Sequence, residues 1–201
     1  MMSYLLSLLT TVLFLLGGCD EDPTHPAPPR ESFFSFEADM EGWNPNGTDL
    51  DLGNTFIEWS ITRNQELAKD GNTSIKFDLN NLNDAGKIWI ERPFAVQPHR
   101  TYHVRIEYAF ASADSGDVNN FTILTGVLPK PPRTRDDLIP TYQEDTGNGG
   151  HLGYTWLDKK YEWTVRSGGD GTLYVIIGIW GTFEVQRIYY VDSVRVTLFD
   201  R

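Results

Sequence analysis

The chain has 201 residues, 13% of them aromatic, a formal net charge of −11 and a single cysteine. The acidic balance argues against nucleic acid as a partner, because that binding relies on Lys and Arg neutralising phosphates. One cysteine excludes an internal disulfide framework. Frequent Gly and Pro, together with short alternating apolar patterns, indicate an all-β chain with many turns.

Residues 1–18 are predicted to be a signal peptide. Their apolar run, residues 4–18, has the length of a signal-peptide core and is short for a membrane span. It ends in Leu16-Gly17-Gly18-Cys19, which resembles the bacterial lipobox. This resemblance implies cleavage before Cys19, lipidation of its thiol, and a membrane-anchored protein of the bacterial cell envelope that faces the periplasm or the exterior. An ordinary secretory signal or a short membrane anchor with an incidental cysteine is the alternative.

Residues 19–32 are polar and proline-rich, and we expect a semi-extended tether there. Residues 33–201 form the folded domain. The apolar alternation predicts about nine strands, over 33–37, 55–62, 74–79, 86–96, 101–112, 119–128, 160–167, 171–180 and 187–198. The near-continuous apolar run of 171–180 indicates a central strand, and Pro93 indicates an edge or a bulge. The segment 129–158 carries little strand pattern, and segments of this length are often functional.

The last strand carries an acid in an apolar row. Position parity places Asp192 on one face with Ile188, Tyr190, Val194, Val196 and Leu198. A carboxylate in such a row is costly to bury unless it is paired. Its partner is a metal ion, or else backbone N–H groups or an arginine.

Four motifs carry a resemblance to β-sandwich carbohydrate-binding modules and galactose-binding-like jelly rolls. They are Phe36-Glu37, Gly42-Trp43, Gly71-Asn72-Thr73-Ser74-Ile75 and Tyr189-Tyr190-Val191-Asp192-Ser193-Val194. The resemblance implies a single β-sandwich of jelly-roll type, with about nine antiparallel strands and with the first and last strands side by side. It also implies a structural calcium ion held by Glu37, Asp39 and Asp192, since calcium binds carboxylate and carbonyl oxygens.

A candidate sugar-binding face follows from strand parity. In 101–112 the residues His103, Arg105 and Glu107 point outward, and in 86–96 and 171–180 Trp89, Glu91 and Trp180 do. Aromatic rings beside such polar groups suit a sugar, whose C–H face packs on a ring and whose hydroxyls need polar partners. We expect these six residues to share one face. The alternative is that Trp89 and Trp180 are covered by 129–158 and belong to the core.

The sequence contains no nucleophile elbow, phosphate loop, dinucleotide fingerprint or zinc-binding cluster. We therefore predict a non-catalytic lipoprotein that binds an oligo- or polysaccharide. A structural or protein-interaction module without a sugar site is the alternative. A jelly-roll polysaccharide lyase or glycosidase is a third, which nothing in the pattern of carboxylates singles out.

Overall fold

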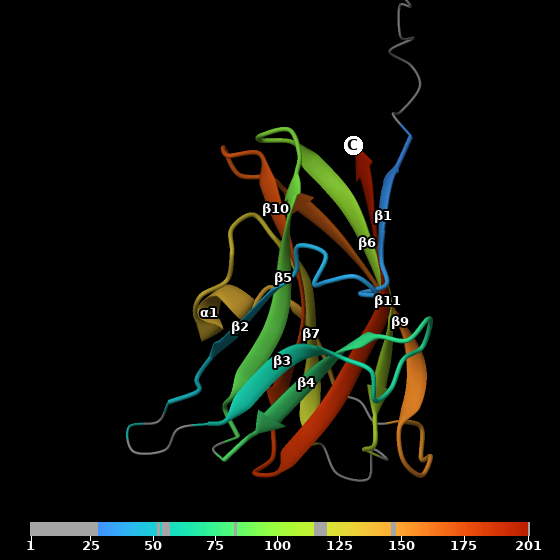
Figure 1. Ribbon diagram of the computed structural model, residues 1–201. Helices are drawn as coiled ribbons and strands as arrows, with labels where there is room; N and C mark the ends of the chain where they lie inside the picture. The colour runs from blue at the N-terminus through green and yellow to red at the C-terminus, as the bar shows by residue number, and fades with distance from the viewer. Residues whose placement is uncertain are drawn as a thin grey trace, which may run out of the picture.

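The computed structural model describes residues 28–51, 53, 57–82, 84–114, 120–145 and 148–200, which form two antiparallel sheets (Figure 1). Sheet A contains β1 (Arg30–Phe34), β3 (Trp59–Asn64), β4 (Ser74–Asn80), β6 (Thr101–Ser112), β9 (Thr155–Arg166) and β11 (Gln186–Asp200). Sheet B contains β2 (Asn44–Thr48), β5 (Lys87–Ala95), β7 (Phe121–Leu128), β8 (Tyr142–Asp145) and β10 (Thr172–Gly181). One helical turn, α1 (Arg135–Leu138), lies between β7 and β8. The predicted all-β sandwich is confirmed.

The strand order within each sheet places the core between them. Sheet A runs β3-β4-β11-β6-β9, with β1 also paired to β11, and sheet B runs β2-β5-β10-β7-β8. Alternate side chains of both sheets meet in one apolar cluster, as Ile88 and Ile90 of β5 do with Val104 and Ile106 of β6. Because successive strand residues point to opposite faces, the remaining residues form the two outer faces of the sandwich.

Nine of the strands overlap the ranges that the alternation predicts, and two do not. The sequence of β2, Asn-Pro-Asn-Gly-Thr, has the composition of a turn, and β8 lies in the segment 129–158. As expected, β10 is central, between β5 and β7. Pro93 of β5 lies beyond the register of β2, which pairs only with residues 87–91, so its missing N–H costs no ladder bond on that side.

A β-bulge in β11 corrects the predicted parity of the last strand. The register with β6 shifts between Asp192 and Arg195, and Ser193 has a positive φ of 53°. Before the bulge Tyr189 and Val191 enter the core, and after it Val194 does. A bulge adds one residue to a strand and so exchanges the faces of the residues that follow. Tyr190 and Asp192 therefore do not share the inward face of Val194.

The first and last strands are adjacent, as the resemblance implied, because β1 pairs antiparallel with β11 from Arg30↔Leu198 to Phe34↔Val194. The strand begins at Arg30, so residues 30–32 belong to the sandwich and not to the predicted tether. The predicted signal peptide, 1–18, and Cys19 lie outside the described residues. Among those residues, no helix is long and apolar enough to cross a membrane.

Candidate functional site

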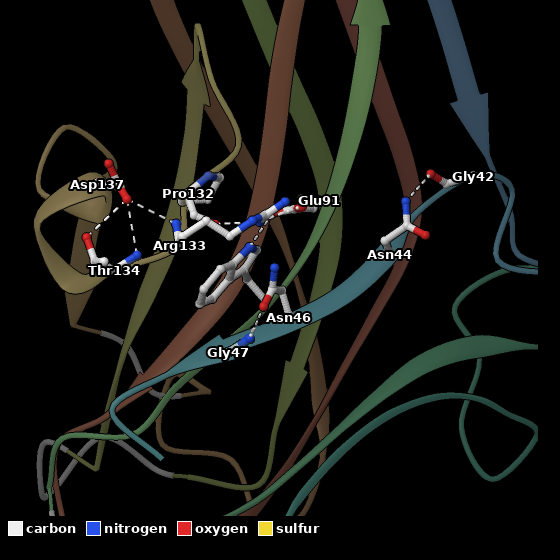
Figure 2. Close-up of polar contacts among 10 residues, drawn as sticks. Gly42, Asn44, Asn46, Gly47, Glu91, Pro132, Arg133, Thr134 and Asp137 are labelled. Atoms are coloured by element: carbon white, nitrogen blue, oxygen red, sulfur yellow. Dashed lines mark hydrogen bonds and ion pairs between the residues drawn. The ribbon is translucent and has the colours of Figure 1, made fainter. Parts of the chain in front are cut away.

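The outer face of sheet B brings polar side chains of an edge strand next to the predicted residues of β5. In the β2–β5 register Asn44 lies opposite Glu91, and Asn46 lies opposite Trp89. Directly opposite residues of an antiparallel pair share a face. Figure 2 shows Asn46 beside Glu91 and Arg133, with Asn44 further along β2. The two asparagines, Glu91 and Arg133 are called the sheet B groove below, a name for this cluster of four polar side chains and not for a cavity.

The carboxylate of Glu91 is held from two sides. The indole Nε1–H of Trp89 donates to its Oε2 at 2.9 Å, and Nη1 of Arg133 donates to Oε1 at 2.8 Å and to Oε2 at 3.0 Å. The side chain of Glu91 is 8% exposed, whereas that of Arg133 is 54% exposed. A buried carboxylate needs such donors to offset the lost hydration. The guanidinium thus fixes Glu91 and keeps a face open to solvent.

The segment that carries Arg133 covers an apolar patch of the same face. Trp89 is 0% exposed and packs with Leu124, Leu128, Leu138 and Ile176, and Trp180 is half-buried against them. Of the two interpretations of Trp89 made from the sequence, the one that covers it with 129–158 is correct. A wholly buried ring offers no surface on which a pyranose can stack, so Trp89 acts through its Nε1–H on Glu91.

The covering segment is fastened at α1 by Asp137. Its carboxylate accepts hydrogen bonds from the backbone N–H groups of Arg133 and Thr134, each at 3.1 Å, and pairs with Lys130 at 2.5 Å. The hydrogen bond from Lys130, followed by those from Arg133 and Thr134, holds the pKa of Asp137 well below its usual range. This capping fixes the backbone beside Arg133 and so the position of its guanidinium.

Trp180 lies at the rim of this face under two cations. Lys87 Nζ lies 4.5 Å and Arg135 Cζ 5.5 Å from the centroid of its ring, and its Nε1–H donates to the carbonyl of Asp84. Burial lowers the pKa of Lys87, and its hydrogen bond to Asp49 opposes that effect. The indole is the one aromatic of the predicted set that retains exposed surface.

The other three predicted ligand residues lie on the opposite side of the molecule, which corrects the prediction of one shared face. His103, Arg105 and Glu107 do point outward, but their strand β6 belongs to sheet A, whereas β5 belongs to sheet B. The reason is the connection after β5, which crosses from one sheet to the other. Parity along a strand predicts which side chains point outward, but it does not predict to which of the two sheets the strand belongs.

On the outer face of sheet A these residues take part in cross-strand charge pairs. Arg105 Nε donates to Glu162 Oε1 at 2.9 Å, and His103 Nε2 lies 3.5 Å from Glu162 Oε2. The hydrogen bond from Arg105 lowers the pKa of Glu162. Glu107 lies opposite Arg195 of β11 and Lys160 of β9.

The acids predicted to hold calcium bond to backbone N–H groups instead. Glu37 Oε1 accepts from Asn72 and Thr73, both at 2.9 Å, and Asp39 Oδ1 accepts from Glu41 at 2.6 Å. Gly71 has a φ of +63°, and a Cβ there would collide with the Glu37 carboxylate. The motif around Gly71 thus allows a close approach of Glu37 to the turn before β4.

Asp192 is 0% exposed, and both of its carboxylate oxygens accept hydrogen bonds from the main chain. Its Oδ2 accepts from the N–H groups of Lys69 at 2.7 Å and Asp70 at 3.1 Å, and its Oδ1 accepts from Ser193 at 2.6 Å. Burial raises the pKa of Asp192, and these N–H groups oppose the shift. No group of three or more His, Cys, Asp or Glu residues in the described ranges is arranged to hold a metal ion. The donor set as it lies does not fit calcium, which takes six to eight oxygens.

Sequence reasoning missed Asn44, Asn46 and Arg133. The asparagines lie in a strand with the composition of a turn, and only the pairing of β2 with β5 reveals their direction. Arg133 follows Pro131-Pro132 in the segment that was singled out for its length, and nothing in its local sequence indicates Glu91 as a partner.

Comparisons with known proteins support the fold. The K3 cleaved adhesin domain of Lys-gingipain from Porphyromonas gingivalis W83 matches with a TM-score of 0.55 and 12% identity, over 85% of this chain and 99% of that one. The K1 cleaved adhesin domain of the same protein matches with a TM-score of 0.54 and 10% identity, over 83% and 97%. No family model matches the chain, and no curated protein does.

Carbohydrate-binding modules are among the further matches. A structure of carbohydrate-binding modules from the β-sandwich superfamily has a TM-score of 0.48 and 16% identity, over 80% of this chain and 59% of that one. The chain therefore spans 59% of the length of that structure. At these identities the likeness is one of fold, and it defines the class of this protein as a β-sandwich domain.

Proposed function

We propose that this protein is a non-catalytic lipoprotein of the bacterial cell envelope that binds an oligo- or polysaccharide in the sheet B groove. The observation that carries the proposal is the geometry of Glu91. Its carboxylate is fixed by Trp89 and by the half-exposed Arg133, and the outward Asn44 and Asn46 of the edge strand β2 lie opposite Glu91 and Trp89. Planar amide, carboxylate and guanidinium groups supply the paired donors and acceptors that vicinal sugar hydroxyls require.

The asparagines keep hydrogen-bonding capacity for a ligand. Asn44 Nδ2 donates to the carbonyl of Gly42, and Asn46 Oδ1 accepts from the N–H of Gly47. Within the part of the chain that the structure describes, these bonds leave Oδ1 of Asn44 and Nδ2 of Asn46 without a protein partner. One free acceptor and one free donor lie along β2, which is suited to a chain of hydroxyls running along the strand.

Trp180 and Arg135 extend the groove at one end. The guanidinium of Arg135 lies over the indole from an exposed position on α1. A sugar ring that stacks on the exposed part of Trp180 displaces or joins Arg135, since both prefer the electron-rich face of the ring. This part of the site accounts for selectivity more than for affinity.

We propose binding without catalysis because both carboxylate oxygens of Glu91 already accept hydrogen bonds from protein donors. A general acid or base must reach the proton that it transfers. The expected anchor at Cys19 would hold this groove near the cell surface. Incorporation of labelled fatty acid that is abolished by Cys19→Ser tests the anchor separately from the sugar site.

A protein-interaction module is the second candidate, and a specific observation favours it. Two solved structures that match with TM-scores of 0.54 and 0.55 are described as cleaved adhesin domains. In that case the same exposed polar groups would contact a protein surface. Binding to a purified cell-surface protein with no affinity for any glycan is the result that would favour this candidate.

A glycan array followed by calorimetry tests the proposal. Wild-type protein without residues 1–19 is compared with Asn46→Ala and Arg133→Ala, and with Arg166→Ala, at an exposed position of β9 on the opposite face, as the matched control. We expect a retained glycan whose affinity falls by roughly tenfold in each groove variant, about 1.4 kcal/mol, and is unchanged in the control. Absence of binding to every glycan at high protein concentration would overturn the proposal.

A further inference from the structure

A hollow lies on the outer face of sheet A, on the far side of the sandwich from the sheet B groove. It has a volume of about 450 Å³ and is formed where β11, β6 and β9 meet the turn before β4. The polar side chains that line it are those of Lys69, Glu107, Asp158, Lys160, Ser193 and Arg195. None of the sequence motifs or the proposed sugar contacts accounts for it as a whole.

The β-bulge of β11 makes this hollow and keeps it rigid. The ladder with β6 loses its register between Asp192 and Arg195, so Ser193 is lifted out of the regular pleat with a φ of 53°. The buried carboxylate of Asp192 bonds to the N–H groups of Ser193 and Lys69, which lie on two walls of the hollow. A non-glycine residue held at positive φ by its surroundings is a common feature of binding sites.

The walls carry more cations than acids, in a protein whose net charge is −11. The lining includes the cations Lys69, Lys159, Lys160 and Arg195 against the acids Glu107 and Asp158. Three of the cations also have acidic neighbours. Lys69 lies 3.6 Å from Asp158, Lys160 lies 3.7 Å from Glu162, and Arg195 pairs with Glu31 at the rim. These are loose or exposed pairs, which contribute little to stability and are readily exchanged for a ligand.

Two groups in the hollow retain their hydrogen-bonding capacity. The carboxylate of Glu107 and the hydroxyl of Ser193 make no hydrogen bond or ion pair with any residue in the described ranges. Glu107 lies directly between Arg195 and Lys160 in the register of the sheet. An acceptor is thus placed between two cations, and a ligand that fills the hollow must both donate hydrogen bonds and carry negative charge.

We propose that this hollow binds a single acidic sugar residue of the uronic acid class. Its carboxylate lies between Lys69 and Lys160, and its ring hydroxyls donate to Glu107 and accept from Arg195 and Ser193. Inorganic phosphate or sulfate does not meet both requirements, because an anion with little or no hydroxyl character is repelled by Glu107. The site is independent of the proposed sugar site in the sheet B groove.

Titration of the ¹⁵N-labelled domain with D-galacturonic acid tests the proposal, with D-galactose and inorganic phosphate as matched probes. We expect galacturonate to shift the amide signals of Ser193 and of Tyr108 and Ala109, and the neutral sugar to bind at least about tenfold more weakly, because a charged contact is worth more than a neutral one. Equal shifts by galactose, or none by galacturonate up to its solubility limit, overturn the proposal.

Four variants sharpen the test. Lys160→Ala should weaken galacturonate binding by roughly tenfold, since it removes one charged partner. Lys130→Ala, an exposed lysine on the opposite face, is the control and should leave it unchanged. Glu107→Gln should weaken galacturonate binding, whereas a simple anion site would bind more tightly once that charge is removed, and such a gain would contradict the proposal. Glu91→Gln should have no effect here, so failure of this site and failure of the groove are distinguishable.

Discussion

Two buried carboxylates of this protein accept hydrogen bonds from different kinds of donor. Among the residues that the structure describes, Asp192 in sheet A accepts hydrogen bonds only from backbone N–H groups, two of which belong to the turn at Lys69 and Asp70. Within the same ranges, Glu91 in sheet B accepts only from side chains, one of which is the half-exposed Arg133. The first carboxylate ties main-chain segments together, and the second presents a fixed polar group at the surface.

This difference assigns the two acids to different properties of the protein. Backbone N–H groups that lose a buried acceptor cannot turn to solvent, so Asp192 matters most for stability. Arg133, the exposed partner of Glu91, can turn to solvent, so the loss of Glu91 affects mainly the geometry of the groove. A carboxylate in an apolar strand is therefore not enough to indicate a binding site. Whether its hydrogen-bond donors are backbone or side-chain groups decides whether it serves stability or binding.

The largest effect is expected for Asp192→Ala. Removal of the carboxylate leaves the N–H groups of Lys69, Asp70 and Ser193 without an acceptor, and we expect the free energy of unfolding to fall by about 3 kcal/mol. Urea denaturation measures it. Asp158→Ala, at an exposed position of the same face, should change it by less than about 0.5 kcal/mol. A loss below about 1 kcal/mol in Asp192→Ala would show that water replaces the carboxylate.

A smaller effect, and one on binding, is expected for Glu91→Gln. The amide oxygen of Gln still accepts one hydrogen bond, so the free energy of unfolding should fall by about 1 kcal/mol. Affinity for the glycan identified by the array should fall by roughly tenfold, because Arg133 is no longer held by two charge-assisted bonds. The comparison between the two acids fails if Glu91→Gln destabilises the domain as strongly as Asp192→Ala and leaves binding intact.

The pH dependence of stability separates the acids further. Burial raises the pKa of Asp192 in the folded state above the ordinary aspartate value of 3.8. Between these two pKa values the folded state binds more protons than the unfolded state. The contribution of Asp192 to the free energy of unfolding therefore declines as pH rises through this window, by at most about 1.4 kcal/mol per pH unit, and is constant above it.

Asp192→Asn should abolish that dependence, because its side chain does not titrate. Urea unfolding of wild type and variant across the acidic range measures the difference in slope. Glu162→Gln serves as the control for an exposed acid, and identical slopes for wild type and Asp192→Asn would mean that Asp192 does not titrate in this window.

The smallest effect is expected for removal of divalent cations. Glu37, Asp39 and Asp192 are directed at N–H groups, so we expect EDTA to leave the melting temperature unchanged and added calcium not to raise it. An ion that binds only the folded state must raise the free energy of unfolding, and with it the melting temperature. A calcium-dependent rise in melting temperature that Asp192→Asn removes would restore the metal site that the resemblance implied.

Most of the strands could be predicted because alternation is a local property of the chain. Tyr102, Val104 and Ile106 alternate with polar residues along β6, and each inward residue is buried. The strand β2 could not be predicted in this way, because its sequence has the composition of a turn and only its pairing with β5 makes it a strand. The parity of β11 could not be followed past Asp192, because the bulge depends on the ladder with β6.

The sequence by itself determined the class of fold, the outward direction of Glu91 and Arg105, and the anomaly at Asp192, since each follows from residues near one another in the chain. Only the tertiary structure decided on which layer those residues lie and which donors they meet. Arg133 is 42 residues from Glu91, and Lys69 is 123 residues from Asp192. Contacts over such separations arise from the pairing and packing of whole strands, for which no local pattern encodes the partner.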